Sequence, residues 1–181
     1  MHLRAQESVL VVVDLQERLL PAIHGAGPVL RHAAMLLRGA AALSVPVVVT
    51  EQYPRGLGAT VAEVRAELPP GTPVIEKISF SSTGEAAFNR ALDDLARPQV
   101  VLCGTEAHVC VLQTALGLQE AGRSVFVVAD AVSSRSPANH HTAIERLRGA
   151  GITIVTTEMV LFEWLERAGT PAFKQLIALI K

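Results

Sequence analysis

The sequence predicts an α/β protein, a three-layer α/β/α sandwich around a six-stranded, mostly parallel sheet that is doubly wound like a Rossmann fold. Six short segments rich in β-branched residues are apolar at successive positions, which is typical of strands covered by helices on both faces. Segments with a helical spacing of apolar residues lie between them, and this alternation favours a doubly wound sheet. The 181 residues contain no repeat and no polar linker, so we expect a single domain over residues 1–181.

The expected strands are residues 8–13, 45–50, 73–76, 99–103, 124–129 and 152–155. Between the first two strands, one apolar stripe predicts a helix, and its members are Val29, Leu30, Ala33, Leu36, Leu37 and Ala40. Before the fourth strand, Phe88, Leu92 and Leu95 recur at four- and three-residue spacing, which predicts a second helix. A further helix is expected over residues 108–120.

Three helix starts carry residues that cap backbone N–H groups. Thr60, with Glu63 three residues later, has the pattern of a capping box. Ser136 and Thr170 each precede a proline, which is favoured in the first turn of a helix. We therefore expect helices to begin after all three positions.

Composition and charge narrow the classes of partner. Sixteen basic and seventeen acidic side chains give a net charge of −1, and no basic block is present, so neither nucleic acid nor an anionic membrane is an expected partner. The apolar runs stop after about five residues, whereas a membrane span needs roughly 20. The two cysteines lie in apolar surroundings and the N-terminus lacks the features of a secretory signal, so we expect a cytoplasmic protein.

An acid, an amine and a thiol follow three of the expected strands. Asp14 follows the first strand, Lys77 follows the third, and Cys110 lies in the loop and helix that follow the fourth. In a doubly wound sheet these carboxyl ends meet where ligands bind. A thiol becomes a nucleophile beside a base, a cation or a helix N-terminus, and Asp14, Lys77 and the helix after Cys110 could supply all three. We therefore expect these residues to act together on a small-molecule substrate.

Two rival classes fit part of this pattern. A phosphorylation-controlled receiver module also has Asp, Thr and Lys at strand ends, but it needs an acidic pair to hold magnesium, and Glu17 is the only acid near Asp14. A binding or scaffold protein could keep the fold without the chemistry. The joint presence of Asp14, Lys77 and Cys110 favours an enzyme, and the reactivity of Cys110 distinguishes the two classes.

The motifs at these strand ends resemble those of the isochorismatase-like cysteine hydrolase family. The matching segments are Asp-Leu-Gln at residues 14–16, Glu-Lys at 76–77, Gly-Thr-Glu-Ala-His-Val-Cys-Val at 104–111 and Asp-Ala-Val-Ser-Ser-Arg at 130–135. With Glu-Gln-Tyr-Pro-Arg-Gly-Leu-Gly at 51–58, the chain most resembles the branch called isochorismatase domain-containing proteins. The order and spacing agree over nearly the whole chain.

The resemblance implies a catalytic triad and a way to hold an oxyanion. Cys110 would be the nucleophile, Asp14 the base that takes its proton, and Lys77 would lie between them. The family's cis peptide bond before the cysteine would fall between Thr105 and Glu106. The backbone N–H groups of Glu106 and Cys110 would then form the oxyanion hole.

Residues near the strand ends are candidates for the substrate pocket. They are Gln16, Tyr53, Arg55, Leu57 and Phe80, and Gln16 could instead hydrogen-bond the loop. Family members that hydrolyse nicotinamide hold a metal with an Asp-x-His pair, and this chain has Glu-Gln-Tyr at 51–53 in its place. We therefore expect no metal and no other cofactor. Isochorismate hydrolases typically lack the cysteine and break a vinyl ether without a covalent intermediate. Cys110 therefore counts against that reaction, which stays the alternative to an amidase-like one.

A homo-oligomer, at least a dimer, is expected from three observations. Half of the residues are hydrophobic, only 18% are charged, and the resembling family forms dimers, tetramers or larger rings. The candidate interface is residues 159–180, with Phe162, Trp164, Leu165, Phe173, Leu176, Ile177 and Ile180.

Overall fold

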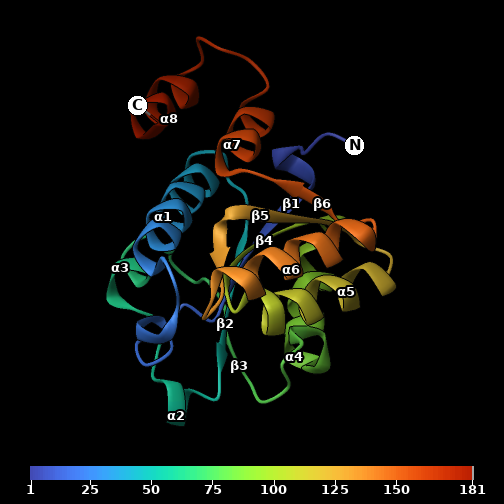
Figure 1. Ribbon diagram of the computed structural model, residues 1–181. Helices are drawn as coiled ribbons and strands as arrows, with labels where there is room; N and C mark the ends of the chain where they lie inside the picture. Colours follow the sequence, from blue (N-terminus) through green and yellow to red (C-terminus); the bar gives the residue numbers. More distant parts are fainter. Residues whose placement is uncertain (181) are drawn as a thin grey trace.

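The computed structural model describes residues 1–180 and contains one six-stranded sheet whose strands are all parallel, in the order β3-β2-β1-β4-β5-β6 (Figure 1). The strands are β1 (Ser8–Val13), β2 (Val47–Gln52), β3 (Val74–Lys77), β4 (Gln99–Thr105), β5 (Ser124–Ser133) and β6 (Thr153–Val155). The chain starts at the centre, builds one edge and returns through β4 to build the other, so the order reverses between β1 and β4. The predicted fold class is confirmed, and the carboxyl ends of these two strands mark the place where ligands bind in such sheets.

Helices cover both faces of the sheet. The α-helices are α1 (Ala26–Ala42), α2 (Pro54–Leu57), α3 (Ala62–Arg65), α4 (Ala86–Leu95), α5 (Leu112–Glu120), α6 (Pro137–Gly149), α7 (Thr157–Leu165) and α8 (Pro171–Ile180). Shorter turns are η1 (Ala5–Glu7), η2 (Leu20–Ala22), η3 (Ser82–Gly84) and the π-helical η4 (Ala107–Val111). Helices α1, α3 and α7 lie on one face, and α4, α5 and α6 lie on the other (Figure 1). No helix within residues 1–180 is both long and apolar enough to cross a membrane.

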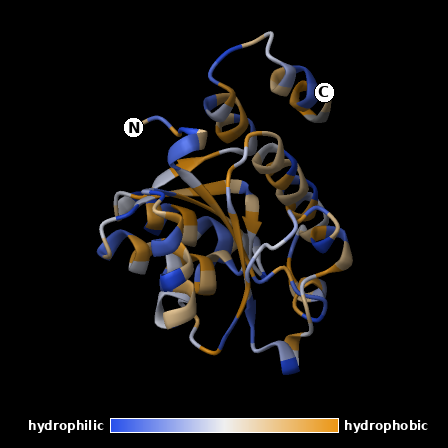
Figure 2. Cartoon of the chain, turned by 180° about the vertical axis from the view of Figure 1, so that it is seen from behind, coloured by the Kyte–Doolittle hydropathy of each residue, from blue (hydrophilic) through white to orange (hydrophobic). Residues whose placement is uncertain are grey.

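Two hydrophobic cores sandwich the sheet, one on each face. Leu10 and Val12 of β1 belong to the core beneath α1 and α7, whereas Val9, Val11 and Val13 belong to the core beneath α4, α5 and α6. Figure 2 shows the hydrophobic residues concentrated in the strands and on the inner faces of the helices. Burying a side chain of this size contributes about 1.5–3 kcal/mol, so β1 anchors both layers.

Strand boundaries differ from the expected ones where backbone pairing decides them. β2 begins at Val47 because Pro46, just before it, has no N–H and only accepts a hydrogen bond, from Leu10 at 2.9 Å. The end of β2 also differs from the expected one, because the strand continues for two more residues, to Gln52. β3 is an edge strand with alternating burial, so the expectation of two apolar faces is wrong for that strand.

The predicted helix starts at Ser136 and Thr170 are confirmed, since each hydroxyl accepts a hydrogen bond from the N–H three residues later. The capping box at Thr60 is wrong. The Thr60 N–H and hydroxyl both donate to the Glu51 carboxylate, at 2.6 and 2.7 Å, because a buried carboxylate at the end of β2 is the stronger acceptor. Thr60 therefore fastens the loop after β2 and does not cap a helix, although the expected helix does begin just after it, as α3 at Ala62.

The candidate interface at residues 159–180 is largely used within the chain. Trp164, Leu165 and Leu176 are buried, and α8 packs against α1 and α7. Met159 and Phe162 remain exposed. Most of the apolar side chains of this segment therefore complete the core of their own subunit, which corrects the expected role of Trp164, Leu165 and Leu176.

Candidate active site

Asp14 lies directly after β1, at the point where the strand order reverses, and its side chain is fully buried. Its backbone has a φ of 51°, a conformation that is uncommon for residues other than glycine and that occurs often at functional sites. Three hydrogen bonds hold it: its N–H donates to the Thr50 carbonyl at 3.1 Å, its carbonyl accepts from the Thr105 hydroxyl at 2.7 Å, and Oδ1 accepts from the Thr50 hydroxyl at 2.8 Å. The second carboxylate oxygen is directed at Lys77.

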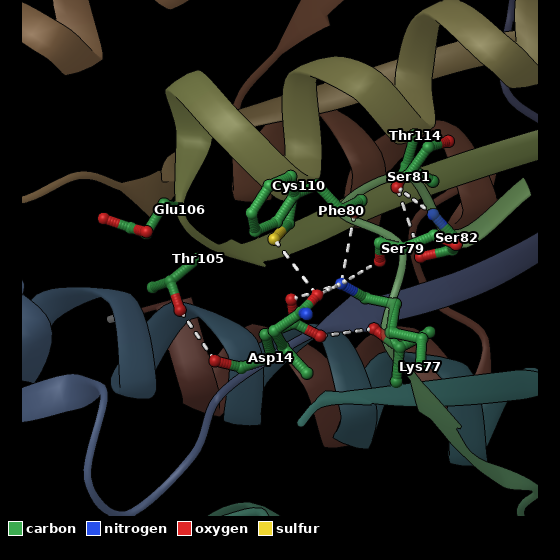
Figure 3. A network of polar contacts seen from close by, with 12 residues as sticks. Asp14, Lys77, Ser79, Phe80, Ser81, Ser82, Thr105, Glu106, Cys110 and Thr114 are labelled. Carbon is green, nitrogen blue, oxygen red and sulfur yellow. Dashed lines mark hydrogen bonds and ion pairs between the residues drawn. The ribbon is translucent and has the colours of Figure 1, made fainter. Parts of the chain in front are cut away.

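Lys77 is the last residue of β3, and its ammonium reaches across β2 to Asp14. Nζ lies 2.8 Å from Asp14 Oδ2, and neither side chain is exposed to solvent (Figure 3). Nζ also donates to Gln52 Oε1 at 2.6 Å and to the Phe80 carbonyl at 3.2 Å, with the Ser79 carbonyl at 3.4 Å. The buried charge therefore has a carboxylate as its ion pair and oxygen acceptors for its remaining hydrogens.

Cys110 faces this pair from the opposite side, with its sulfur directed at the cluster (Figure 3). It lies in η4, where the Glu106 carbonyl accepts from the N–H groups of Val109 and Val111, at 3.1 Å each, and not from that of Cys110. The expected regular helix over residues 108–120 is thus corrected: a π-helical turn comes first, and α5 begins at Leu112. Such turns are frequent at functional sites.

Burial controls the protonation of the site. The pKa of the Cys110 thiol is raised to about 12, first by burial and then by the negative charge of Asp14, while Lys77 opposes both. Burial likewise raises the pKa of the Asp14 carboxyl, against the attraction of Lys77. Desolvation therefore outweighs the effect of Lys77 on the Cys110 thiol, and the predicted transfer of its proton to Asp14 stays a prediction.

The segment before Cys110 has a constrained backbone. Gly104 has a φ of 121°, and a side-chain Cβ there would lie 2.0 Å from the Val13 carbonyl oxygen, so only glycine fits between β1 and β4. The Thr105–Glu106 peptide bond is cis, at the position that the resemblance implies. The Glu106 carboxylate points away from Cys110 and pairs with Arg135, whose Nε lies 2.5 Å from Oε1 (Figure 3). Glu106 thus presents only its backbone on the side of the sulfur.

The pocket candidates fall into two groups. Gln16 is fully buried, and its amide makes two hydrogen bonds with the backbone of Gln52, at the end of β2, and one with Gly58 in the loop after it, which favours its loop-binding alternative. Tyr53 and Phe80 are 52% and 55% exposed, and the Phe80 carbonyl contacts Lys77 directly. Arg55 is exposed and Leu57 is half-buried, both on the short helix α2. The exposed members form a rim near the strand ends, and their contact with substrate stays a prediction.

Two residues of the cluster were not among the candidates: Thr50 holds Asp14, and Gln52 contacts Lys77 and lies 3.9 Å from the Cys110 sulfur. Thr105 was predicted only for the cis peptide bond, and its hydroxyl also holds Asp14. All three are polar residues at the carboxyl ends of strands, and that position is the signal that could have found them.

A surface hollow of about 830 Å³ lies elsewhere on the molecule. It is lined by Pro46, Pro73 and Arg97 among others, which precede β2, β3 and β4. It therefore opens at the amino ends of the strands, a sheet's length from Cys110. Among residues 1–180, no three His, Cys, Asp or Glu side chains are grouped to hold a metal ion, and metal independence stays a prediction.

The fold and the site together define a doubly wound α/β protein with a buried acid, amine and thiol at its switch point. Residues 8–159 match the model of the Isochorismatase domain, and the chain belongs to this family. It is 43% identical over 181 residues to isochorismatase domain-containing protein 2 from Danio rerio, covering 99% of this chain and 89% of that protein.

Solved structures agree with the fold. A structure described as MAR1 ribonuclease from Caenorhabditis elegans superposes with a TM-score of 0.95 at 37% identity, covering 99% of this chain and 92% of that one. The YcaC gene product from Escherichia coli, described as an octameric hydrolase of unknown specificity, has a TM-score of 0.92 at 24% identity, with 99% and 90% covered. At that identity the second likeness concerns the fold alone.

Proposed function

We propose that this protein is a cysteine hydrolase that cleaves a small amide, or a related C–N or ester bond, through a thioester on Cys110. The single observation that carries the proposal is the fully buried contact between Asp14 and Lys77, 2.8 Å apart, with the Cys110 sulfur directed at it. Burying two charges costs several kcal/mol per ion, and a catalytic site is a reason for placing them beside a thiol.

The first half of the reaction forms the thioester. Asp14 takes the proton of the Cys110 thiol as Sγ bonds to the substrate carbonyl carbon. The backbone N–H groups of Glu106 and Cys110 hold the developing oxyanion. The C–N or C–O bond then breaks, and the leaving group departs with the proton that Asp14 returns. Asp14 is an anion again, and the acyl group remains on sulfur.

The second half releases the acid. Asp14 takes a proton from a water molecule that attacks the thioester carbonyl, and the sulfur leaves and recovers that proton. The raised pKa values of both groups support this cycle. Burial disfavours the charged forms of both Asp14 and Cys110. The thiol can therefore keep its proton at rest and pass it to Asp14 only as the sulfur reacts. Lys77 stays charged and stabilises whichever of the two is the anion.

Three other functions remain as alternatives. A silent binding protein of the same fold would have an inert Cys110, and a vinyl ether hydrolase would turn over without it. The Caenorhabditis elegans neighbour is described as a ribonuclease. The net charge of −1 without a basic block does not favour RNA, which proteins bind chiefly through Lys and Arg contacts to phosphate. Each alternative predicts a different outcome of one set of assays.

The test is a panel of small amides, ureas and esters, with a vinyl ether and an RNA oligonucleotide as comparison substrates, read by release of ammonia, acid or nucleotide. Cys110→Ala should abolish turnover, and Cys103→Ala, which changes the buried cysteine of β4, should be nearly silent. Acid quench followed by mass spectrometry should trap an acyl fragment on Cys110. Full activity of Cys110→Ala would falsify covalent catalysis and leave Asp14 as the acid of a cysteine-free hydrolysis.

The assembly and the compartment belong to the same proposal. We expect a homo-oligomer in the cytoplasm. Among large hydrophobic side chains, Tyr53, Ile78, Phe80, Met159 and Phe162 are exposed, and association would cover such groups. The reduced state of the two cysteines, neither of which forms a disulfide, is compatible with a reducing compartment.

A further inference from the structure

Gln52 occupies a place beside the candidate triad that the proposed chemistry leaves without a role. It is the last residue of β2, and in the parallel pairing of β2 with β3 its direct partner is Lys77. Its side chain is buried, and Oε1 lies 2.6 Å from Lys77 Nζ and 3.9 Å from Cys110 Sγ. One amide oxygen therefore contacts both the amine and the thiol.

The orientation of this amide is fixed by its partners. Nε2 donates to the Ile78 carbonyl at 2.8 Å, and Oε1 accepts from the Lys77 ammonium. A reversed amide would set an NH₂ group against an ammonium and an oxygen against a carbonyl, with no hydrogen to share in either contact. Only one orientation satisfies both neighbours, and it directs an acceptor at the site.

The backbone of Gln52 is equally constrained. Its N–H donates to Gln16 Oε1 at 2.7 Å, and its carbonyl accepts from Gln16 Nε2 at 3.0 Å. Gln16 also donates to the Gly58 carbonyl at 2.7 Å, which holds the loop after β2 in place. The buried side chain of Gln16, two residues after Asp14, thus clamps Gln52 from both sides.

The Lys77 ammonium has three hydrogens and four oxygen neighbours, of which the Ser79 carbonyl at 3.4 Å is the most distant. Its shortest contacts are Gln52 Oε1 at 2.6 Å, Asp14 Oδ2 at 2.8 Å and the Phe80 carbonyl at 3.2 Å. Of these, Gln52 Oε1 is also within contact distance of the sulfur. Without it, the ammonium would keep Asp14 and the carbonyls of Phe80 and Ser79, and it would lose the one acceptor that also contacts Cys110.

We propose that Gln52 is a positioning residue, which rests on the proposed function: it accepts a hydrogen bond from Lys77 and holds the ammonium where it stabilises the Cys110 thiolate. The two groups that face Oε1 are the Lys77 ammonium and the Cys110 thiol, and both take part in the first step of the proposed reaction. The titratable groups around it are Asp14 after β1, Lys77 on β3 and Cys110 in η4. Gln16 acts through the backbone of Gln52 and touches none of these charges.

The test measures how fast iodoacetamide alkylates Cys110 as a function of pH, in the full-length protein, with each site resolved by mass spectrometry. Gln52→Met keeps the length of the side chain without the acceptor, and we expect alkylation at pH 7 to be about tenfold slower, which corresponds to a thiol pKa one unit higher. Gln52→Asn keeps the amide but is one methylene shorter, so it should lose the 2.6 Å contact with Lys77 and slow alkylation to a similar extent. Gln113→Met, the same change at an exposed position of α5, is the matched control and should follow the unaltered protein.

The outcomes separate this inference from the proposed function. If Cys110 reacts faster than Cys103 but both Gln52 variants keep the unaltered pH profile, the positioning role is wrong and the proposed function stands. If Cys110 of the unaltered protein is as inert as Cys103, both are overturned. Should Gln52→Met fail to fold, the Gln52→Asn profile decides alone, since a purely structural role lowers stability without changing the alkylation rate of the folded protein.

Discussion

Asp14→Asn should slow turnover but speed the alkylation of Cys110 by iodoacetamide. The substitution keeps the size of the side chain and its hydrogen bond with Thr50 but removes the charge that pairs with Lys77. In the proposed cycle Asp14 carries a proton from the thiol to the leaving group, so kcat should fall by roughly 10² to 10⁴. Alkylation by iodoacetamide requires only a thiolate, because iodide leaves without a proton.

The magnitude follows from the geometry of the ion pair. At 2.8 Å and an effective dielectric constant of about 20, two unit charges attract by about 6 kcal/mol. In Asp14→Asn the buried ammonium loses this partner, and Cys110 is the acidic group beside it that can replace the carboxylate. A thiolate that recovers even a quarter of the attraction has its pKa lowered by about one unit. Alkylation of Cys110 at pH 7 should therefore become about tenfold faster or more.

The assay compares two rates on one preparation: turnover of any substrate found in the panel, and site-resolved alkylation of Cys110. Cys103, buried in β4, is the internal control and should not change. If alkylation slowed in step with turnover, the negative charge of Asp14 would not be what raises the thiol pKa, and the electrostatic reasoning would be refuted. Thermal unfolding of the variant checks that the fold is kept.

Four further predictions follow from the same structure. Burial raises the pKa of the Cys103 thiol to about 12, so from about pH 9 the unfolded chain loses a proton that the folded chain keeps. The free energy of unfolding should therefore fall by up to about 1.4 kcal/mol per pH unit above about pH 9. Urea titrations at several pH values should show a shallower fall for Cys103→Ala. Gly104→Ala should cost about 2–6 kcal/mol from overpacking against Val13 and backbone strain, while Gly149→Ala, whose Cβ would meet nothing within 4 Å, should be tolerated. Exhaustive chelation should leave turnover intact. Loss of turnover in EDTA and its restoration by zinc would contradict the prediction that the site holds no metal. Light scattering at micromolar concentration should give a multiple of the subunit mass, and a monomeric mass would contradict the predicted homo-oligomer.

The fold could be predicted because its strongest signals are local. Runs such as residues 9–13 are apolar at every position, and only a sheet covered on both faces buries them all. Asp14 and Lys77 follow such runs directly, so their convergence at one edge was a consequence of topology. β3 was read less accurately because an edge strand has one neighbour and needs only one buried face.

The features that could not be predicted from the sequence depend on backbone pairing and burial. The strand expected to end at residue 50 continues to Gln52, and this extension sets Gln52 opposite Lys77 in register. No local pattern shows that a glutamine amide will face an ammonium. The raised pKa of the Cys110 thiol could not be predicted for a similar reason, since the desolvation that raises it comes from residues distant in the chain.

The cost of the Asp14–Lys77 pair bears on why it exists. A fully buried ion pair is weak evidence for stability, because the loss of hydration of two charges consumes most of their attraction, and apolar pairs of similar size often serve as well. Thr50, Thr105, Gln52 and the Phe80 carbonyl nevertheless hold Asp14 and Lys77 in place. Such support fixes charges where they cannot reorganise, and preorganised charge next to a reacting atom is what lowers a barrier. The arrangement is therefore better explained by the reaction of a thiol than by the folding of a sheet.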